Sequence, residues 1–233
     1  MGTYRFPFDA RSLVALVALA WLASFAHEFT HHAAGAWLCG VPGRMSLSLF
    51  ALDVACGERW PWTTAAGPAL SYVLMWIGMA LIVRDMRRGA DPWWGFALVI
   101  ANKPFLRLLT AVMGGGDEGV LWDLLTPDAG RWIATATVIA LSLPPMIVCW
   151  LALKPRNRGR VFAAAFLVPM LPLLPVPFLD RAVYGAWFDG TTVLGAWFGV
   201  PWTVWAIEAG VLAALLLARV WMPRTAASSA FAR

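Results

Sequence analysis

Long apolar stretches separated by short polar segments dominate this sequence of 233 residues, and they limit the possible folds more than any other feature. A helix that crosses a lipid bilayer needs about 20 mostly apolar residues. Six stretches meet this requirement, at roughly 12–38, 60–83, 92–113, 130–153, 160–182 and 192–221. We therefore expect an all-α, polytopic membrane protein with about six transmembrane helices.

The amino-acid composition points to the same class. Hydrophobic residues make up 61% of the chain and charged residues only 13%, and the mean hydropathy is +0.69. Soluble domains carry about 25% charged residues. Many of the 15 tryptophans lie near the ends of apolar runs, as Trp60 and Trp62 do, which is typical of the aromatic belt at a membrane interface.

The connections between the apolar stretches are short, and no internal repeat is evident. We expect residues 1–233 to form a single integral membrane domain with a core at about 12–125 and additional helices at about 130–222. The alternating run within 40–59 could form a short β-hairpin between the first two helices. The residues after Met222 resemble a frayed polar tail.

Two features near the N-terminus leave alternatives open. The run from Arg11 to Ala26 resembles a signal peptide, but apolar residues continue through Leu38, which favours a retained helix. Cys39 and Cys56 could pair if the 40–59 loop lies outside the cytoplasm, although unpaired packing is the favoured interpretation.

The basic residues predict the orientation, because cytoplasmic loops carry an excess of Lys and Arg. We therefore expect both termini to be cytoplasmic and the 40–59 loop to lie outside, in a bacterial-type inner or plasma membrane. The net charge of +5 then reflects this topology and contact with anionic lipid, and no nucleic acid is expected as a partner. The predicted cytoplasmic set is Arg5, Arg11, Arg84, Arg87, Arg88, Lys154, Arg156, Arg158, Arg160, Arg219, Arg224 and Arg233, and the opposite set is Arg44, Arg59, Arg131 and Arg181.

The first apolar stretch contains the motif His27-Glu28-Phe29-Thr30-His31, with His32 directly after it. Residues four apart lie on one face of a helix at about 6 Å, so His27 and His31 can offer two imidazoles to one zinc ion. Glu28 lies beside them and can accept a proton from a water molecule on the metal. His32 points about 100° away from this face, which indicates a neighbour of the site and not a ligand.

Histidines at the end of a helix can also be merely solvated at the interface. Against that interpretation, an ionisable group at membrane depth costs roughly 2.5–3.5 kcal/mol, so such groups usually mark function. All three histidines of the chain fall within six residues, His27 to His32. The pattern therefore favours a metal site.

A second motif, Ala66-Gly67-Pro68-Ala69-Leu70-Ser71, lies near the start of the second stretch. Its small residues permit close approach to a neighbouring helix. Taken alone, the run also fits the start of a helix with proline in the first turn.

A zinc motif on the first helix followed by an Ala-Gly-Pro motif on the next resembles the site-2 protease family of intramembrane zinc metalloproteases. The resemblance covers roughly residues 20–120. It implies a three-helix catalytic core, one Zn²⁺ per chain and an aspartate as third ligand on the next core helix. Its implied activity is that of a zinc metalloendopeptidase acting on transmembrane segments of membrane proteins.

Two aspartates compete for the place of the third ligand, because neither matches the family's Leu-Asp-Gly sequence. Asp117 follows three glycines at the end of the third expected helix, which also carries Asn102 and Arg107. Asp180 ends a proline-rich run that resembles the family's lead-in, but Arg181 follows it where the family has glycine. The order of the core helices favours Asp117.

In the mechanism that the resemblance implies, Glu28 is the catalytic base and His27, His31 and Asp117 hold the zinc ion. Asn102 or Arg107 could help to stabilise an oxyanion. A substrate helix would have to unwind locally, since its carbonyls are otherwise hydrogen-bonded. Two alternatives remain open at this point: a metal-binding membrane transporter, and an inactive relative that binds membrane proteins.

Overall fold

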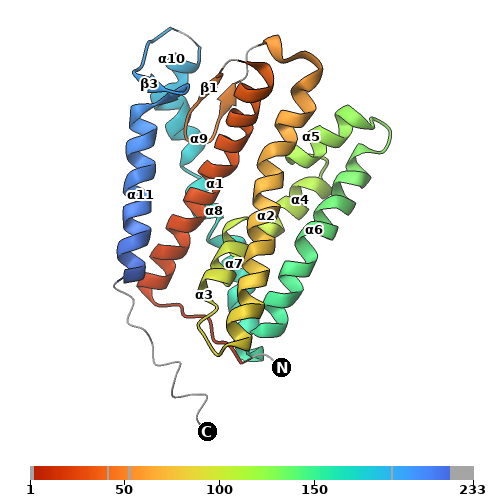
Figure 1. The fold of residues 1–233 in the computed structure, drawn as a ribbon, viewed down its shortest axis with the longest axis vertical. Coiled ribbons are helices and arrows are strands. Elements are labelled where there is room, and N and C mark those ends of the chain that lie inside the picture. Colours follow the sequence, from red (N-terminus) through yellow and green to blue (C-terminus); the bar gives the residue numbers. More distant parts are fainter. Residues whose placement is uncertain (1–2, 41, 52–53, 190, 221–233) are drawn as a thin grey trace.

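The computed structural model describes residues 3–40, 42–51, 54–189 and 191–220. This part of the chain is mostly helical, as expected (Figure 1). Five of its helical segments are long and apolar enough to cross a membrane: Ala10–Cys39, Trp60–Arg87, Trp93–Val112, Gly130–Ala152 and Trp202–Arg219. The tail after Met222 lies outside the described residues.

Helix α1 (Ala10–Cys39) has clear signals at both ends. The carboxylate of Asp9 accepts hydrogen bonds from the backbone N–H and the hydroxyl of Ser12, at 3.0 and 2.8 Å, which caps the first turn. Gly40 ends the helix with a φ of 79°, and its N–H donates to the carbonyl of Ala36. The helix runs without a break through the region that resembles a signal peptide.

The segment after α1 forms the expected hairpin. Strands β1 (Arg44–Met45) and β2 (Phe50–Ala51) are antiparallel, with Met45 opposite Phe50. A 3₁₀ segment (Val54–Arg59) leads into α2 (Trp60–Arg87). The structure joins Cys39 to Cys56 in a disulfide with a Cα–Cα distance of 4.9 Å, so the expectation that these cysteines stay unpaired is wrong.

The third apolar stretch is not one helix. It is divided into α3 (Trp93–Ala101) and α4 (Pro104–Val112), because Pro104 has no N–H to continue the helical hydrogen bonds and disfavours helical backbone at the residue before it. Lys103, at this break, has left-handed backbone with a φ of 57°. A separate helix, α5 (Gly116–Leu125), then follows, so Asp117 starts a new helix and does not end the third one.

The fourth stretch forms α6 (Gly130–Ala152), and the fifth is broken into short helices by its prolines. These are α7 (Pro155–Leu167), α8 (Met170–Leu173), α9 (Val176–Leu179), a π-helical turn (Asp180–Tyr184) and α10 (Gly185–Phe188). A single helix over 160–182 is therefore not formed. The sixth stretch also begins later than expected: a hairpin of β3 (Ala196–Trp197) and β4 (Val200–Pro201) precedes α11 (Trp202–Val220).

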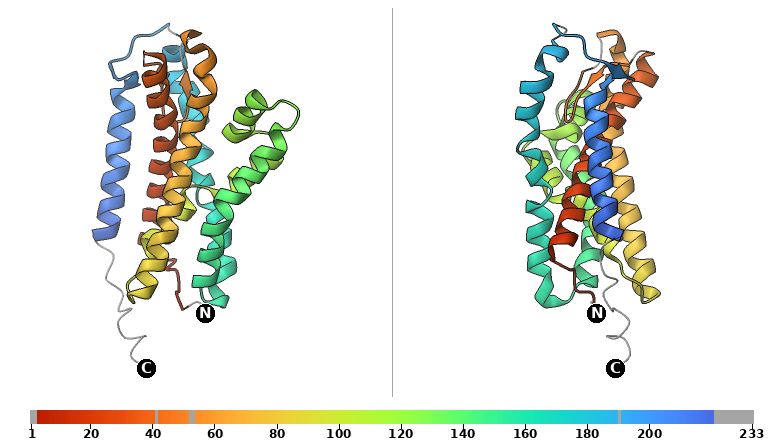
Figure 2. Two further views of the ribbon diagram at one scale, coloured as in Figure 1. Left: turned by 45° about the vertical axis from the view of Figure 1, so that its right-hand side comes forward. Right: turned by 90° about the vertical axis from the view of Figure 1, so that its left-hand side faces the viewer.

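The long helices lie side by side, with α11 against α1, α2 on the other side of α1, and α6 beyond α2 (Figure 2). Both hairpins and α10 lie at the end of the bundle where α1 finishes, and α11 ends near the start of α1 (Figure 1). A large apolar cluster, including Phe6, Trp93 and Phe96, fills the end at which α1 begins. A smaller cluster, including Phe25, Met45 and Val204, packs beneath the hairpins at the other end.

Candidate metal centre

His27 and His31 lie one helical turn apart on α1 and face the interior of the bundle. Their relative exposures are 7% and 0%. The Nε2 atoms of the two imidazoles are 3.1 Å apart, and the rings meet edge to face. The helical spacing of the motif therefore produces the expected pair of converging nitrogens.

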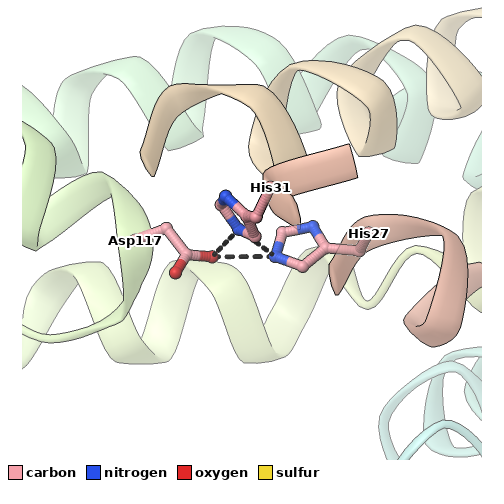
Figure 3. A group of neighbouring side chains, drawn as sticks. All are labelled: His27, His31 and Asp117. Carbon is pink, nitrogen blue, oxygen red and sulfur yellow. Dashed lines mark hydrogen bonds and ion pairs between the residues drawn. The ribbon is translucent and has the colours of Figure 1, made fainter. Parts of the chain in front are cut away.

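Asp117 approaches the same point from a different part of the chain. Its Oδ2 atom lies 2.8 Å from Nε2 of His27 and 3.5 Å from Nε2 of His31 (Figure 3). Two glycines with left-handed backbone, Gly114 at φ 77° and Gly116 at φ 75°, make the turn that places Asp117 in the first turn of α5. The carboxylate also interacts favourably with the positive end of this helix.

The three side chains have the chemistry and the spacing of a group that could hold a metal ion such as zinc. Their ligand atoms all lie within 4.8 Å of one another. Ligands of a tetrahedral zinc ion, bound at 2.0–2.1 Å, are about 3.3 Å apart, and the three distances here range from 2.8 to 3.5 Å. Two imidazoles and one carboxylate form a common ligand set that leaves a fourth position open for water or substrate.

The Ala-Gly-Pro motif lies directly against one of these imidazoles. A Cβ atom added to Gly67 would overlap the ring of His31, coming within 2.6 Å of its Cδ2 atom. The Nδ1 atom of His31 also lies 2.8 Å from the carbonyl oxygen of Thr63, which is on α2 like Gly67. This carbonyl can accept the Nδ1 proton, which leaves the Nε2 lone pair free to face the site. Pro68 lies inside α2, so the interpretation of this motif as the first turn of a helix is wrong.

Glu28 is partly buried and follows His27 directly on α1. Its carboxylate lies within electrostatic range of His31, Asp117 and Lys103. Lys103 occupies the break between α3 and α4, so the break brings a basic group toward Glu28. This placement is compatible with the expected role of Glu28 as a proton acceptor at the site.

A second layer of polar residues surrounds His27. Its Nδ1 atom lies 3.1 Å from Oγ of Ser71 and 2.9 Å from Nη2 of Arg107. Arg107 forms a buried ion pair with Glu118 at 2.8 Å, and the hydroxyl of Tyr72 donates to the same carboxylate at 2.6 Å. The sequence singled out Arg107 but gave no role to Tyr72, and Ser71 appeared only as the last residue of the Ala-Gly-Pro motif.

The other aspartate, Asp180, has different partners. Its carboxylate accepts hydrogen bonds from the N–H groups of Leu47 and Ser48, at 3.0 and 2.9 Å, and from the hydroxyl of Ser48 at 2.5 Å. These residues form the turn between β1 and β2. Asp180 therefore anchors the hairpin, and Phe50 of that hairpin stacks on the ring of His31 with a centroid distance of 5.0 Å.

His32 and Asn102 also point to partners outside the metal centre. Nε2 of His32 lies 2.7 Å from the carbonyl oxygen of Phe198, in the turn of the second hairpin. The amide of Asn102 donates to the carbonyl of Leu98 on α3 at 2.8 Å. The described contacts thus give His32 the neighbouring position that the helical geometry predicted.

Comparison of the chain with protein-family models, with curated proteins and with solved structures found no match.

Proposed function

We propose that this chain is an intramembrane zinc metalloprotease similar to the site-2 protease family. It would hydrolyse peptide bonds of membrane-protein substrates within or near the bilayer. The observation that supports this most is the convergence of His27, His31 and Asp117 within 4.8 Å, with the carboxylate of Glu28 in electrostatic range of His31 and Asp117. Burying ionisable side chains among apolar helices costs free energy, so their presence there usually marks a functional site.

In this proposal, His27, His31 and Asp117 hold one zinc ion. When bound, the ion lowers the pKa of a coordinated water and polarises the substrate carbonyl. Glu28 accepts the proton of the attacking water and then delivers a proton to the leaving amine. Thr63 and Gly67 position the imidazole of His31, the former through its carbonyl and the latter by leaving room for the ring.

We further propose that α1, α2 and the α3–α5 region form the catalytic core, and that the α7–α10 region completes six crossings of the membrane. The basic ends of the helices would lie in the cytoplasm, together with both termini. The disulfide between Cys39 and Cys56 supports this orientation, because it lies at the opposite end and disulfides persist outside the cytoplasm. A substrate segment would be a transmembrane helix that unwinds near the cut.

The substitution Glu28→Gln tests the mechanism. The amide has nearly the same volume as the carboxylate but cannot accept the proton of the water. We expect the purified variant to keep wild-type zinc content and to lose at least 100-fold in cleavage of a model transmembrane substrate, as is typical for the loss of a general base. Zinc content is measured by elemental analysis and cleavage by electrophoresis.

Glu208→Gln provides the matched control. Glu208 is a buried carboxylate on α11 that accepts a hydrogen bond from the indole of Trp21, and a glutamine oxygen can accept the same bond. This variant should keep both zinc and activity. Full cleavage by Glu28→Gln would refute the protease mechanism, and zinc binding without cleavage by the wild-type chain would favour the transporter or the inactive relative.

A further inference from the structure

The two ring nitrogens of His27 have separate surroundings. Nε2 faces Asp117 and His31, at 2.8 and 3.1 Å, and so belongs to the candidate metal centre. Nδ1 lies on the opposite edge of the ring and faces Ser71 and Arg107. Arg107 is therefore behind His27 as seen from the metal centre, which makes it a positioning residue and a poor candidate for an oxyanion donor.

Arg107 is compatible with only one tautomer of this imidazole, whereas Ser71 can serve the other. A guanidinium can only donate hydrogen bonds, so its contact with Nδ1 at 2.9 Å requires a lone pair on Nδ1 and leaves the proton on Nε2. A metal ligand at Nε2 needs the reverse, with the proton on Nδ1 donated to an acceptor. The hydroxyl of Ser71, at 3.1 Å from Nδ1, can accept that proton.

Arg107 cannot easily withdraw from His27, because it is held on several sides. Its Nη1 donates to Glu118 at 2.8 Å, its Nη2 also donates to Ser71 at 2.9 Å, and its Nε donates to the carbonyl of Asn102 at 3.3 Å. The side chains of Arg107 and Glu118 are only 11% and 4% exposed. The positive charge of Arg107 is thus held near the position of a dication, which opposes metal binding as well.

We propose that Ser71 and Arg107 set the metal affinity of this site through the tautomer of His27. Ser71 stabilises the tautomer that binds metal, and Arg107 stabilises the one that does not. The site consequently holds its metal less tightly than the same three ligands would without Arg107. This inference rests on the proposed zinc site.

Zinc affinity of the purified full-length chain tests this directly, with Zn²⁺ titrated against a competing chelator. Partners that orient a metal-bound histidine typically change metal affinity by 10–100-fold. We therefore expect Ser71→Ala to weaken zinc binding about tenfold or more. Ser142→Ala is the matched control, since Ser142 is a buried serine on α6 whose hydroxyl has no hydrogen-bond partner among the described residues. It should leave the affinity unchanged.

The double substitution Arg107→Met with Glu118→Gln tests the opposing residue without leaving a buried charge unpaired. It should tighten zinc binding about tenfold relative to the wild-type chain. Co²⁺ absorption provides a second readout, because tetrahedral coordination should persist in every variant that binds. Unchanged or tighter affinity in Ser71→Ala overturns the proposal even if the double variant does not fold, and unchanged or weaker affinity in a folded double variant also overturns it.

The same titration separates this inference from the proposed function. His27→Ala combined with His31→Ala should bind no zinc at the site. If the wild-type chain binds zinc no better than this variant, the proposed zinc site itself is refuted. If the wild-type chain binds zinc but the Ser71 and Arg107 variants behave like Ser142→Ala, the site stands and only the tautomer proposal fails.

Discussion

At the scale of single residues, the candidate site combines side chains that lie far apart in the sequence. His27 and His31 are four residues apart on one helix, whereas Asp117 lies about 90 residues away along the chain and approaches them to 2.8 and 3.5 Å. The structure places Asp117, and not Asp180, beside the histidines. The role of Asp117 as a metal ligand stays a prediction.

Paired substitutions of the two aspartates test that role. Asp117→Asn should remove most of the zinc and the activity together, because a dication at low dielectric then has only neutral ligands. Asp180→Asn should keep zinc, since its carboxylate binds the turn of the first hairpin. Elemental analysis of the two purified variants distinguishes them. Loss of zinc from Asp180→Asn alone would make Asp180 the third ligand.

Gly67 allows a prediction from packing alone. The methyl group of Gly67→Ala would overlap the ring of His31, so the imidazole must move away from its position over α2. We expect the variant to lose about 1–3 kcal/mol of stability through overpacking, and to lose zinc as well. Gly210→Ala is the control, because a methyl group there meets no atom within 4 Å. Normal zinc content in Gly67→Ala would show that His31 does not need this position.

At the scale of elements, interruptions in the helices matter as much as the helices. The break between α3 and α4 exposes non-helical backbone within an apolar stretch, which membrane proteins tolerate only where protein or a wet cavity surrounds it. The glycine turn after α4 then starts α5 with Asp117 in its first turn. These two breaks bring the carboxylate to the histidines on α1.

The disulfide ties the end of α1 to the 3₁₀ segment that leads into α2. The two cysteines are 17 residues apart, and closing a loop of this length stabilises a fold by about 3 kcal/mol in the chain-entropy model. We expect Cys39→Ser combined with Cys56→Ser to lower the free energy of unfolding by about this amount. A reducing agent should lower the melting temperature of the wild-type chain and leave that of the double variant unchanged. Equal melting temperatures for the wild-type chain with and without the agent would contradict the prediction.

At the scale of the whole molecule, basic residues gather at one end of the bundle. They lie before or at the start of α1, at the end of α2, at the start of α7 and at the end of α11, and these ends lie together (Figure 2). The disulfide and both hairpins lie at the other end (Figure 1). This separation of charge and disulfide is typical of a membrane protein with its basic end in the cytoplasm.

Reporter fusions test the orientation. A reporter fused after α11 should be active only as a cytoplasmic reporter, and one inserted in the 40–59 loop only as an external reporter. The metal centre would then lie toward the outer half of the bilayer, since His27 is 16 residues or about 24 Å along α1 from Arg11. A cytoplasmic 40–59 loop would reverse this placement.

The sequence by itself determined the membrane class, most helical regions, the short hairpin after the first helix and the pairing of His27 with His31. Each of these depends on local information: the length of an apolar run, the alternation within a strand, or the four-residue spacing of a helical face. The prolines at these breaks, Pro104 and those of the proline-rich region, can be seen in the sequence. A pattern of hydropathy, however, does not show how strongly each proline bends or divides a helix.

Only the tertiary structure decided which aspartate reaches the histidines, that Cys39 meets Cys56, and that Ser71 and Arg107 lie behind His27. These contacts join residues 17 to 90 positions apart. They depend on the angles at which helices pack and on turns that redirect the chain by a few residues, such as the left-handed glycines before Asp117. Apolar periodicity shows which face of a helix is buried but not which helix it faces, so the partners of a buried polar side chain follow only from the packed structure.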